Sequence, residues 1–84
     1  MAGDGLEGNE KVRVLDVKGL ACPLPVLRAN KALRDVPKGG LIQVLATDPG
    51  AVKDFKAFCK TTRNELVSWQ EADGVYTFLI RKPA

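Results

Sequence analysis

The chain has 84 residues, of which 45% are hydrophobic, and it carries a formal net charge of +3. This length supports one small hydrophobic core, and no apolar run approaches the ~20 residues that cross a membrane. With no such run and no basic, apolar signal peptide at its start, the chain is expected to be cytoplasmic. The two cysteines and the absence of histidine argue against a disulfide scaffold, a metal site and Cys-His hydrolase chemistry.

Residues 1–11 are predicted to form a disordered tail, and residues 12–83 are predicted to form a single domain. The first ten residues hold three glycines, three acidic residues and no basic residue, which is the reverse of a basic, apolar signal peptide. Residues 11–84 therefore carry 13 basic residues against 7 acidic ones, a balance of +6. A basic domain favours acidic partners, either protein or nucleic acid.

The first half of the domain predicts a strand, a helix and a second strand. Residues 12–17 are β-branched and roughly alternating, which indicates a strand that ends before Gly19. A helix is expected from Pro23 to about Asp35, because apolar residues recur there at helical spacing. After a turn rich in proline and glycine, residues 41–46 form a nearly continuous apolar run, which is expected of a central strand.

The second half of the domain predicts a helix and a β-hairpin. Asp48 is the predicted N-cap and Pro49 the predicted first residue of a helix that runs to about Thr62. Strands are expected over residues 65–71 and 75–81, joined by a short turn that contains glycine.

This order of elements, βαβαββ, predicts an α+β fold. Both βα units require right-handed crossovers, which put the two helices on one side of the sheet. We therefore expect a two-layer sandwich, with two helices packed on one face of a four-stranded mixed sheet. The other face is left open and is expected to carry an exposed apolar patch with Trp69 or Val67, and such patches often bind partners.

Cys22 is the candidate reactive residue. It follows a strand and a loop that contains Gly19, and it directly precedes the first predicted helix in the segment Cys22-Pro23-Leu24-Pro25. The positive end of a helix dipole favours the thiolate, which is the reactive form of cysteine. Pro23 and Pro25 each remove an N–H group and fix a φ angle, so the junction between loop and helix is expected to be stiff.

The positive potential at this thiol is expected to come from the remaining N–H groups of Cys22, Leu24 and Val26, with Lys18 and Arg28 as nearby basic residues. The alternative interpretation of the cysteine is an inert, buried, small hydrophobic residue. A thioredoxin-like redox pair is disfavoured, because a proline stands where the second cysteine of that motif would be.

Asp48, Pro49 and Gly50 are explained as the start of a helix, but their loop should emerge at the same sheet edge as Cys22 and can therefore border its site. Cys59 lies at helical spacing on an apolar stripe, which favours burial in the core. The alternative for this second cysteine is a resolving thiol for the first.

Lysine and arginine residues on the helices are by default a solvated face. The alternative is that some of them dock a partner protein. The candidates for docking are Lys18, Arg28 and Lys31.

These residues together resemble the TusA family of SirA-like sulfurtransferases, over about residues 14–82. A Cys-Pro-x-Pro motif is weak alone, but an Asp-Pro-Gly about 25 residues later in a chain of this length makes the pattern specific. The matching segments are Leu15-Asp16, Gly19-Leu20, Cys22-Pro23-x-Pro25, Lys31, Gly40, Asp48-Pro49-Gly50-Ala51 and Leu79-Ile80-Arg81-Lys82.

The resemblance implies a sulfurtransferase that works as a sulfur carrier and needs no cofactor of its own. In this family the motif cysteine, Cys22 here, accepts a persulfide sulfur from a cysteine desulfurase and passes it to a cysteine of a DsrE-like or TusBCD-type acceptor. The sulfur then serves 2-thiouridine synthesis in tRNA or another sulfur relay. No membrane partner and no direct nucleic-acid contact are implied. The residues expected to support the site are Gly19, Pro23, Pro25, Asp48, Pro49 and Gly50.

Two alternative functions stay open from the sequence. The first is a basic RNA-binding module, for which Trp69 and Tyr76 are the candidate stacking residues. The second is a regulatory protein that senses a partner or redox conditions through oxidation of Cys22. A binding module would keep its activity after Cys22→Ser, whereas a carrier would lose it.

Overall fold

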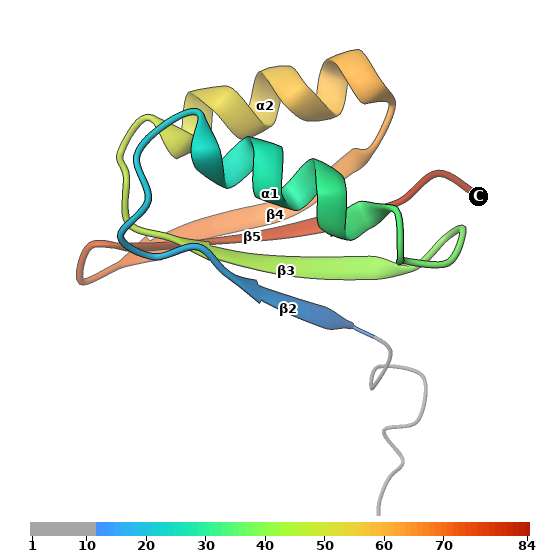
Figure 1. Ribbon diagram of the computed structural model, residues 1–84, viewed down its shortest axis with the longest axis horizontal. Helices are drawn as coiled ribbons and strands as arrows, with labels where there is room; N and C mark the ends of the chain where they lie inside the picture. The colour runs from blue at the N-terminus through green and yellow to red at the C-terminus, as the bar shows by residue number, and fades with distance from the viewer. Residues whose placement is uncertain (1–11) are drawn as a thin grey trace, which may run out of the picture.

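Two helices cover one face of a four-stranded mixed sheet in the computed structural model, which describes residues 12–84 (Figure 1). The predicted α+β class and two-layer sandwich are thereby confirmed. The predicted disordered tail, residues 1–11, lies outside the described residues. No helix within the described part is long and apolar enough to cross a membrane. The elements are β2 (Arg13–Asp16), α1 (Leu24–Leu33), β3 (Leu41–Ala46), α2 (Ala51–Thr62), β4 (Glu65–Ala72) and β5 (Val75–Arg81).

The strand order is β2-β3-β5-β4, so β3 and β5 form the centre of the sheet. β2 pairs with β3 in parallel, and β5 pairs antiparallel with both β3 and β4. The apolar run of β3 fits this central place, because Ile42, Val44 and Ala46 are fully buried against the helices. The residues between them are half-buried on the other face, as a strand's alternation requires.

Phe55 of α2 joins the helical layer to the sheet. Its ring is fully buried, and its centroid lies 4.6 Å from that of Phe78 on β5. Small buried residues on both helices, Ala29, Ala32 and Ala51, leave room for this close packing. The large aromatic side chain thus fills the centre of the core between the two layers.

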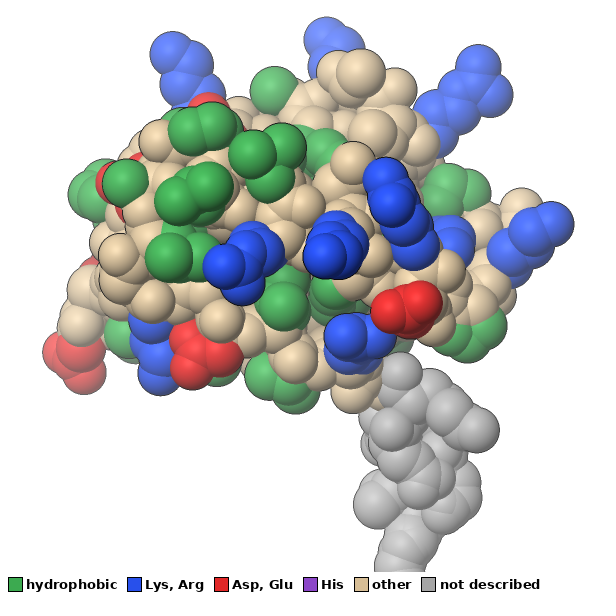
Figure 2. Space-filling view, in the orientation of Figure 1, with side chains coloured by type: hydrophobic (Ala, Val, Ile, Leu, Met, Phe, Trp, Pro, Cys, Tyr) green, Lys and Arg blue, Asp and Glu red, His purple; other side chains and the backbone are tan. Residues whose placement is uncertain are grey.

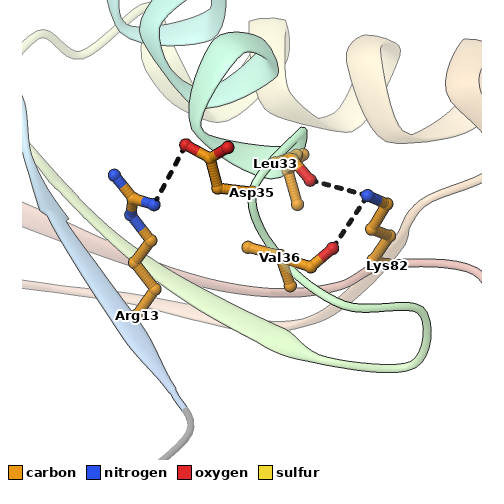
Figure 3. Close-up of polar contacts among 5 residues, drawn as sticks. All are labelled: Arg13, Leu33, Asp35, Val36 and Lys82. Carbon is orange, nitrogen blue, oxygen red and sulfur yellow. Dashed lines mark hydrogen bonds and ion pairs between the residues drawn. The ribbon is translucent and has the colours of Figure 1, made fainter.

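Lys82, just beyond β5, holds the C-terminal end of α1 (Figure 3). Its Nζ donates hydrogen bonds to the backbone carbonyls of Leu33 and Val36, both at 2.8 Å. These carbonyls lie where a helix leaves its last acceptors without partners in the helix. Arg13 and Asp35 also pair nearby at 3.5 Å, but both side chains are exposed, so this ion pair adds little stability.

The start of α2 differs from the prediction. The helix begins at Ala51 and not at Pro49, and its N-cap is Gly50, which makes no side-chain capping bond. The side chain of Asp48, the predicted N-cap, does not cap the first turn of α2, although the backbone carbonyl of this residue accepts the N–H of Ala51 at 2.9 Å. Its carboxylate accepts a hydrogen bond from the backbone N–H of Cys22 instead, at 3.3 Å.

A bulge in β4 places Trp69 on the face that the helices cover. The register with β5 shifts at Val67, so that Trp69 lies opposite the buried Phe78. The two rings stack with centroids 6.4 Å apart, and Nζ of Lys56 on α2 lies 5.6 Å from the indole. The prediction that Trp69 belongs to the open face is therefore wrong, because one extra residue reverses the strand's alternation.

The open face carries both apolar and polar side chains: Val14, which pairs with Gln43 there, is 59% exposed, and Leu79 is half-buried. Val67 itself is 39% exposed at the bulge. A shallow hollow on this part of the sheet has a mixed lining, made up of Val12, Gln43, Ser68, Trp69, Gln70, Thr77 and Leu79.

The central place of Phe55 predicts that Phe55→Ala lowers the free energy of unfolding by about 3–5 kcal/mol, because the smaller side chain leaves a cavity between the layers. Leu27→Ala is the matched control, since Leu27 is 57% exposed on α1, and it is expected to change stability by less than about 0.5 kcal/mol. Urea unfolding followed by circular dichroism measures both values. Equal losses in the two variants would contradict this account of the core.

Candidate functional site

Cys22 lies in the loop between β2 and α1. Figure 1 shows this loop and the loop between β3 and α2 at the same edge of the sheet. Because β2 and β3 are parallel, the loops that follow them leave the sheet at the same edge. Hydrogen bonds join these loops: the N–H of Val17 donates to the carbonyl of Leu45 at 2.8 Å, and the N–H of Gly19 donates to Oγ1 of Thr47 at 2.9 Å. The loop that carries the cysteine is therefore fixed to the loop that precedes α2.

The second loop reaches the cysteine directly. Asp48 accepts the Cys22 N–H, as described above, and Gly50 lies against the Cys22 side chain. A Cβ on Gly50 would lie 3.8 Å from Cβ of Cys22 and 4.0 Å from its Sγ. Pro49 is exposed in the turn between these two residues. The structure thus brings the Asp-Pro-Gly segment to the thiol.

The turn before α1 positions the thiol from the other side. α1 begins at Leu24, one residue later than predicted, with Pro23 as its N-cap and Pro25 buried in its first turn. A cis peptide bond joins Cys22 to Pro23. The N–H of Leu24 donates to the carbonyl of Ala21 at 2.9 Å. The sequence predicted that the N–H groups of Cys22, Leu24 and Val26 supply positive potential at the sulfur. The first two of these groups donate hydrogen bonds to other acceptors.

Asp54 is the contact of the thiol that the sequence did not indicate. Sγ of Cys22 makes a hydrogen bond with Oδ2 of Asp54, on the first turn of α2. An acidic residue in the first turn is ordinary in a helix, because it complements the helix dipole. Asp54 lies one helical turn after Gly50, and the loop that contains Gly50 was expected beside the thiol. This spacing is the signal that could have suggested the contact.

The basic residues proposed from the sequence do not contact the sulfur. Lys18 pairs with Asp16 at 3.7 Å, and both side chains are about half exposed. Arg28 and Lys31 line a hollow beside α1 that also includes Arg13. Within residues 12–84, no lysine or arginine makes a hydrogen bond or an ion pair with the thiol.

Cys59 differs from Cys22 in both exposure and chemistry. Both thiols are free, but Cys22 is exposed, whereas Cys59 is only 4% exposed in the core. Burial raises the pKa of the Cys59 thiol to about 11. The described part of the chain has no cluster of three or more residues that could bind a metal ion. Its one accessible thiol is therefore the candidate reactive group.

Exposed apolar side chains surround the start of α1. Leu24 is 45% exposed and Leu27 is 57% exposed. Figure 2 shows hydrophobic side chains gathered over the side where both helices begin, with lysine and arginine side chains further along α1. A shallow groove between the helices runs from Asp54 past Val26 and Phe58. The thiol thus lies beside a surface that is apolar at one end and basic at the other.

Comparison with known proteins supports a role in sulfur transfer. A family profile described as Sulfurtransferase TusA matches residues 13–82. The chain is 54% identical over 68 residues to the Sulfur carrier protein TusA of Allochromatium vinosum, covering 81% of this chain and 90% of that protein. It is 52% identical over 67 residues to a putative sulfur carrier protein of Neisseria meningitidis, covering 80% of this chain and 90% of that protein. The solved structure of a SirA-like protein from Desulfitobacterium hafniense matches with a TM-score of 0.76 and 27% identity, over 87% of this chain and all of that one.

The different exposure of the two thiols predicts selective alkylation of the folded chain. At pH 8, iodoacetamide is expected to modify Cys22 and not Cys59, because a thiol with a pKa of about 11 is ionised in roughly one molecule per thousand at that pH. Peptide mapping by mass spectrometry identifies the modified residue. In urea both cysteines should react. Comparable labelling of the two thiols in the folded chain would show that Cys59 is not buried as described.

The raised pKa of Cys59 also predicts a loss of stability at high pH. Between its ordinary value of 9.0 and about 11, the unfolded chain loses the thiol proton while the folded chain keeps it. The unfolded state then binds fewer protons, so the free energy of unfolding falls as the pH rises through this range. In Cys59→Ala the fall over the same range should be smaller. Identical pH profiles of urea unfolding for the two proteins would contradict the prediction.

Proposed function

This chain belongs to the TusA family of sulfurtransferases and has the role of a sulfur carrier, and we propose that it carries the sulfur as a persulfide on Cys22. The observation that carries the proposal is that Cys22 is exposed where two loops meet, while Cys59 is buried with a raised pKa. A carrier needs one thiol that a second protein can reach. Cys22 fits this requirement, and Cys59 does not.

In the proposed loading step, a cysteine desulfurase presents a persulfide on its own cysteine. The thiolate of Cys22 attacks the terminal sulfur, and a new S–S bond forms at Sγ. The S–S bond of the donor breaks, and its electron pair stays on the donor's cysteine sulfur. The proton lost by the Cys22 thiol balances the proton that the donor thiolate takes up. The step needs no external oxidant or reductant, and it needs no cofactor in the carrier.

In the proposed delivery step, a thiolate on an acceptor protein of DsrE-like or TusBCD type attacks the terminal sulfur held on Cys22. The carrier's S–S bond breaks, and Sγ leaves with the electron pair as a thiolate. The sulfur then continues to tRNA 2-thiouridine synthesis or to another relay. We place this exchange in the cytoplasm, where thiols are kept reduced.

The residues around the thiol are proposed to position it for both steps. The residues before α1 form the turn that carries the sulfur. The residues in the loop before α2 contact this turn and fix its position. The positioning residues proposed here are Gly19, Pro23, Pro25, Asp48, Pro49 and Gly50.

The surface beside the thiol is proposed to dock the donor and acceptor proteins. Leu24 and Leu27 offer exposed apolar area next to the sulfur. Lys18, Arg28 and Lys31 add positive charge that would steer an acidic partner surface.

The RNA-binding alternative is not favoured by the geometry. Trp69 stacks on Phe78 and contacts Lys56 of α2, so its ring is not on the open face of the sheet where a base could stack on it. A redox sensor would use the same exposed Cys22. The two functions differ in what modifies this thiol: an oxidant in a sensor, and a sulfur donor protein in a carrier.

Intact mass spectrometry tests the proposal. After incubation with a cysteine desulfurase and cysteine, the chain is expected to gain the mass of one sulfur atom, and reductant should remove it. Cys22→Ser should gain none, whereas Cys59→Ala, the matched control, should load as the wild type does. Sulfur found on Cys59, or on neither cysteine, would refute the proposed carrier site.

A further inference from the structure

We propose that Asp54 is a positioning residue that holds the thiol hydrogen of Cys22 and keeps the resting sulfur neutral. The observation is the hydrogen bond between Sγ and Oδ2 of Asp54. The inference rests on the proposed function in one respect: it describes how the carrier's thiol is restrained before sulfur arrives. Asp54 acts on the reactivity of Cys22 and forms no bond to the sulfur that is carried.

The fold fixes this contact from two separate elements. Asp54 lies in the first turn of α2, where its N–H donates to the carbonyl of Gly50 at 3.1 Å. Cys22 lies in the loop before α1, and Asp48 holds its backbone N–H. Asp54 is half-buried, so its carboxylate is less free to turn away than a fully exposed one. The contact therefore defines one direction for the thiol.

The charges around the sulfur favour the neutral thiol. A carboxylate accepts a hydrogen bond from S–H but repels S⁻, so its presence disfavours the thiolate. Two carboxylates, Asp54 on α2 and Asp48 in the loop before it, contact Cys22. Of the nearby bases, Lys18 pairs with Asp16, and Arg28 on α1 lines a separate hollow.

Two of the backbone N–H groups nearest the thiol are bonded elsewhere and do not offset this negative charge. A helix N-terminus stabilises an anion through N–H groups that have no other partner. Here the N–H of Cys22 donates to Asp48, and the N–H of Leu24 donates to Ala21. The thiol thus lies near the starts of two helices, yet its direct polar partner is a carboxylate. The resting carrier is restrained until this hydrogen bond is broken.

Alkylation kinetics without any sulfur donor test the inference. The rate of modification of Cys22 by iodoacetamide is measured from pH 6 to 10 for the wild type, Asp54→Asn and Asp54→Glu, with peptide mapping to exclude Cys59. In Asp54→Asn the midpoint of the pH–rate profile should fall by about one unit. The rate at pH 7 should rise about threefold, because about tenfold more thiolate is partly offset by its lower nucleophilicity. Asp54→Glu, which keeps the charge, should stay near the wild-type profile.

Asp35→Asn is the matched control, because it removes the same charge just beyond the far end of α1, where Asp35 pairs with Arg13. It should leave the profile unchanged. An unchanged or slower reaction in Asp54→Asn would overturn the inference, as would equal shifts in the Asn and Glu variants. Urea unfolding checks that each variant is folded, and Asp54→Ser replaces the Asn variant if that one is not. These results are independent of sulfur loading, so a failed carrier assay and a failed role for Asp54 are told apart.

Discussion

The parallel pairing of β2 with β3 is the constraint on which the site depends. It sends both loops out at one sheet edge, so two helices begin beside each other and the thiol lies between their starts. The remaining contacts refine this placement. Thr47 and Asp48 each accept an N–H from the first loop, and Gly50 has no side chain to keep the loops apart. A register shift between these two strands would separate every one of these partners.

The proposed role of Asp54 implies that a helix N-terminus is not by itself a place for an anion. Two helices begin near Cys22, and either dipole favours negative charge on the sulfur. The free N–H groups that would transmit this effect are few, because neighbouring acceptors and prolines occupy or remove them. Asp54 then adds a negative charge at contact distance. At short range the specific hydrogen-bond partner outweighs the more distant dipole, since Coulomb interactions weaken with distance and solvent.

Much of the fold could be predicted from local patterns, and much of the site could not. The order of elements follows from strand and helix periodicity, and Cys22 stands out because of the prolines around it. Asp54 was not singled out, because an acidic first turn is ordinary and its contact is made across the fold; only its place one turn after Gly50 pointed toward the thiol. Asp48 is a residue type that often caps helices, but its carboxylate accepts the backbone N–H of Cys22 from the other loop instead. Trp69 was assigned to the wrong face because strict alternation takes no account of the extra residue in β4.

For the proposed carrier, the burial of Cys59 bears on how the sulfur can leave. A persulfide is discharged when another thiolate attacks it; within one chain, attack on the inner sulfur of Cys22 would release sulfide and leave an internal disulfide, and attack on the terminal sulfur would move that sulfur to the second cysteine. Cys59 is enclosed in the core and its proton is tightly held, so the chain has no second thiol ready to attack its own cargo. Release then depends on meeting another molecule. In the proposed carrier, the packing that stabilises α2 thus also keeps Cys59 away from sulfur held on Cys22, so that the proposed transfer takes place between molecules.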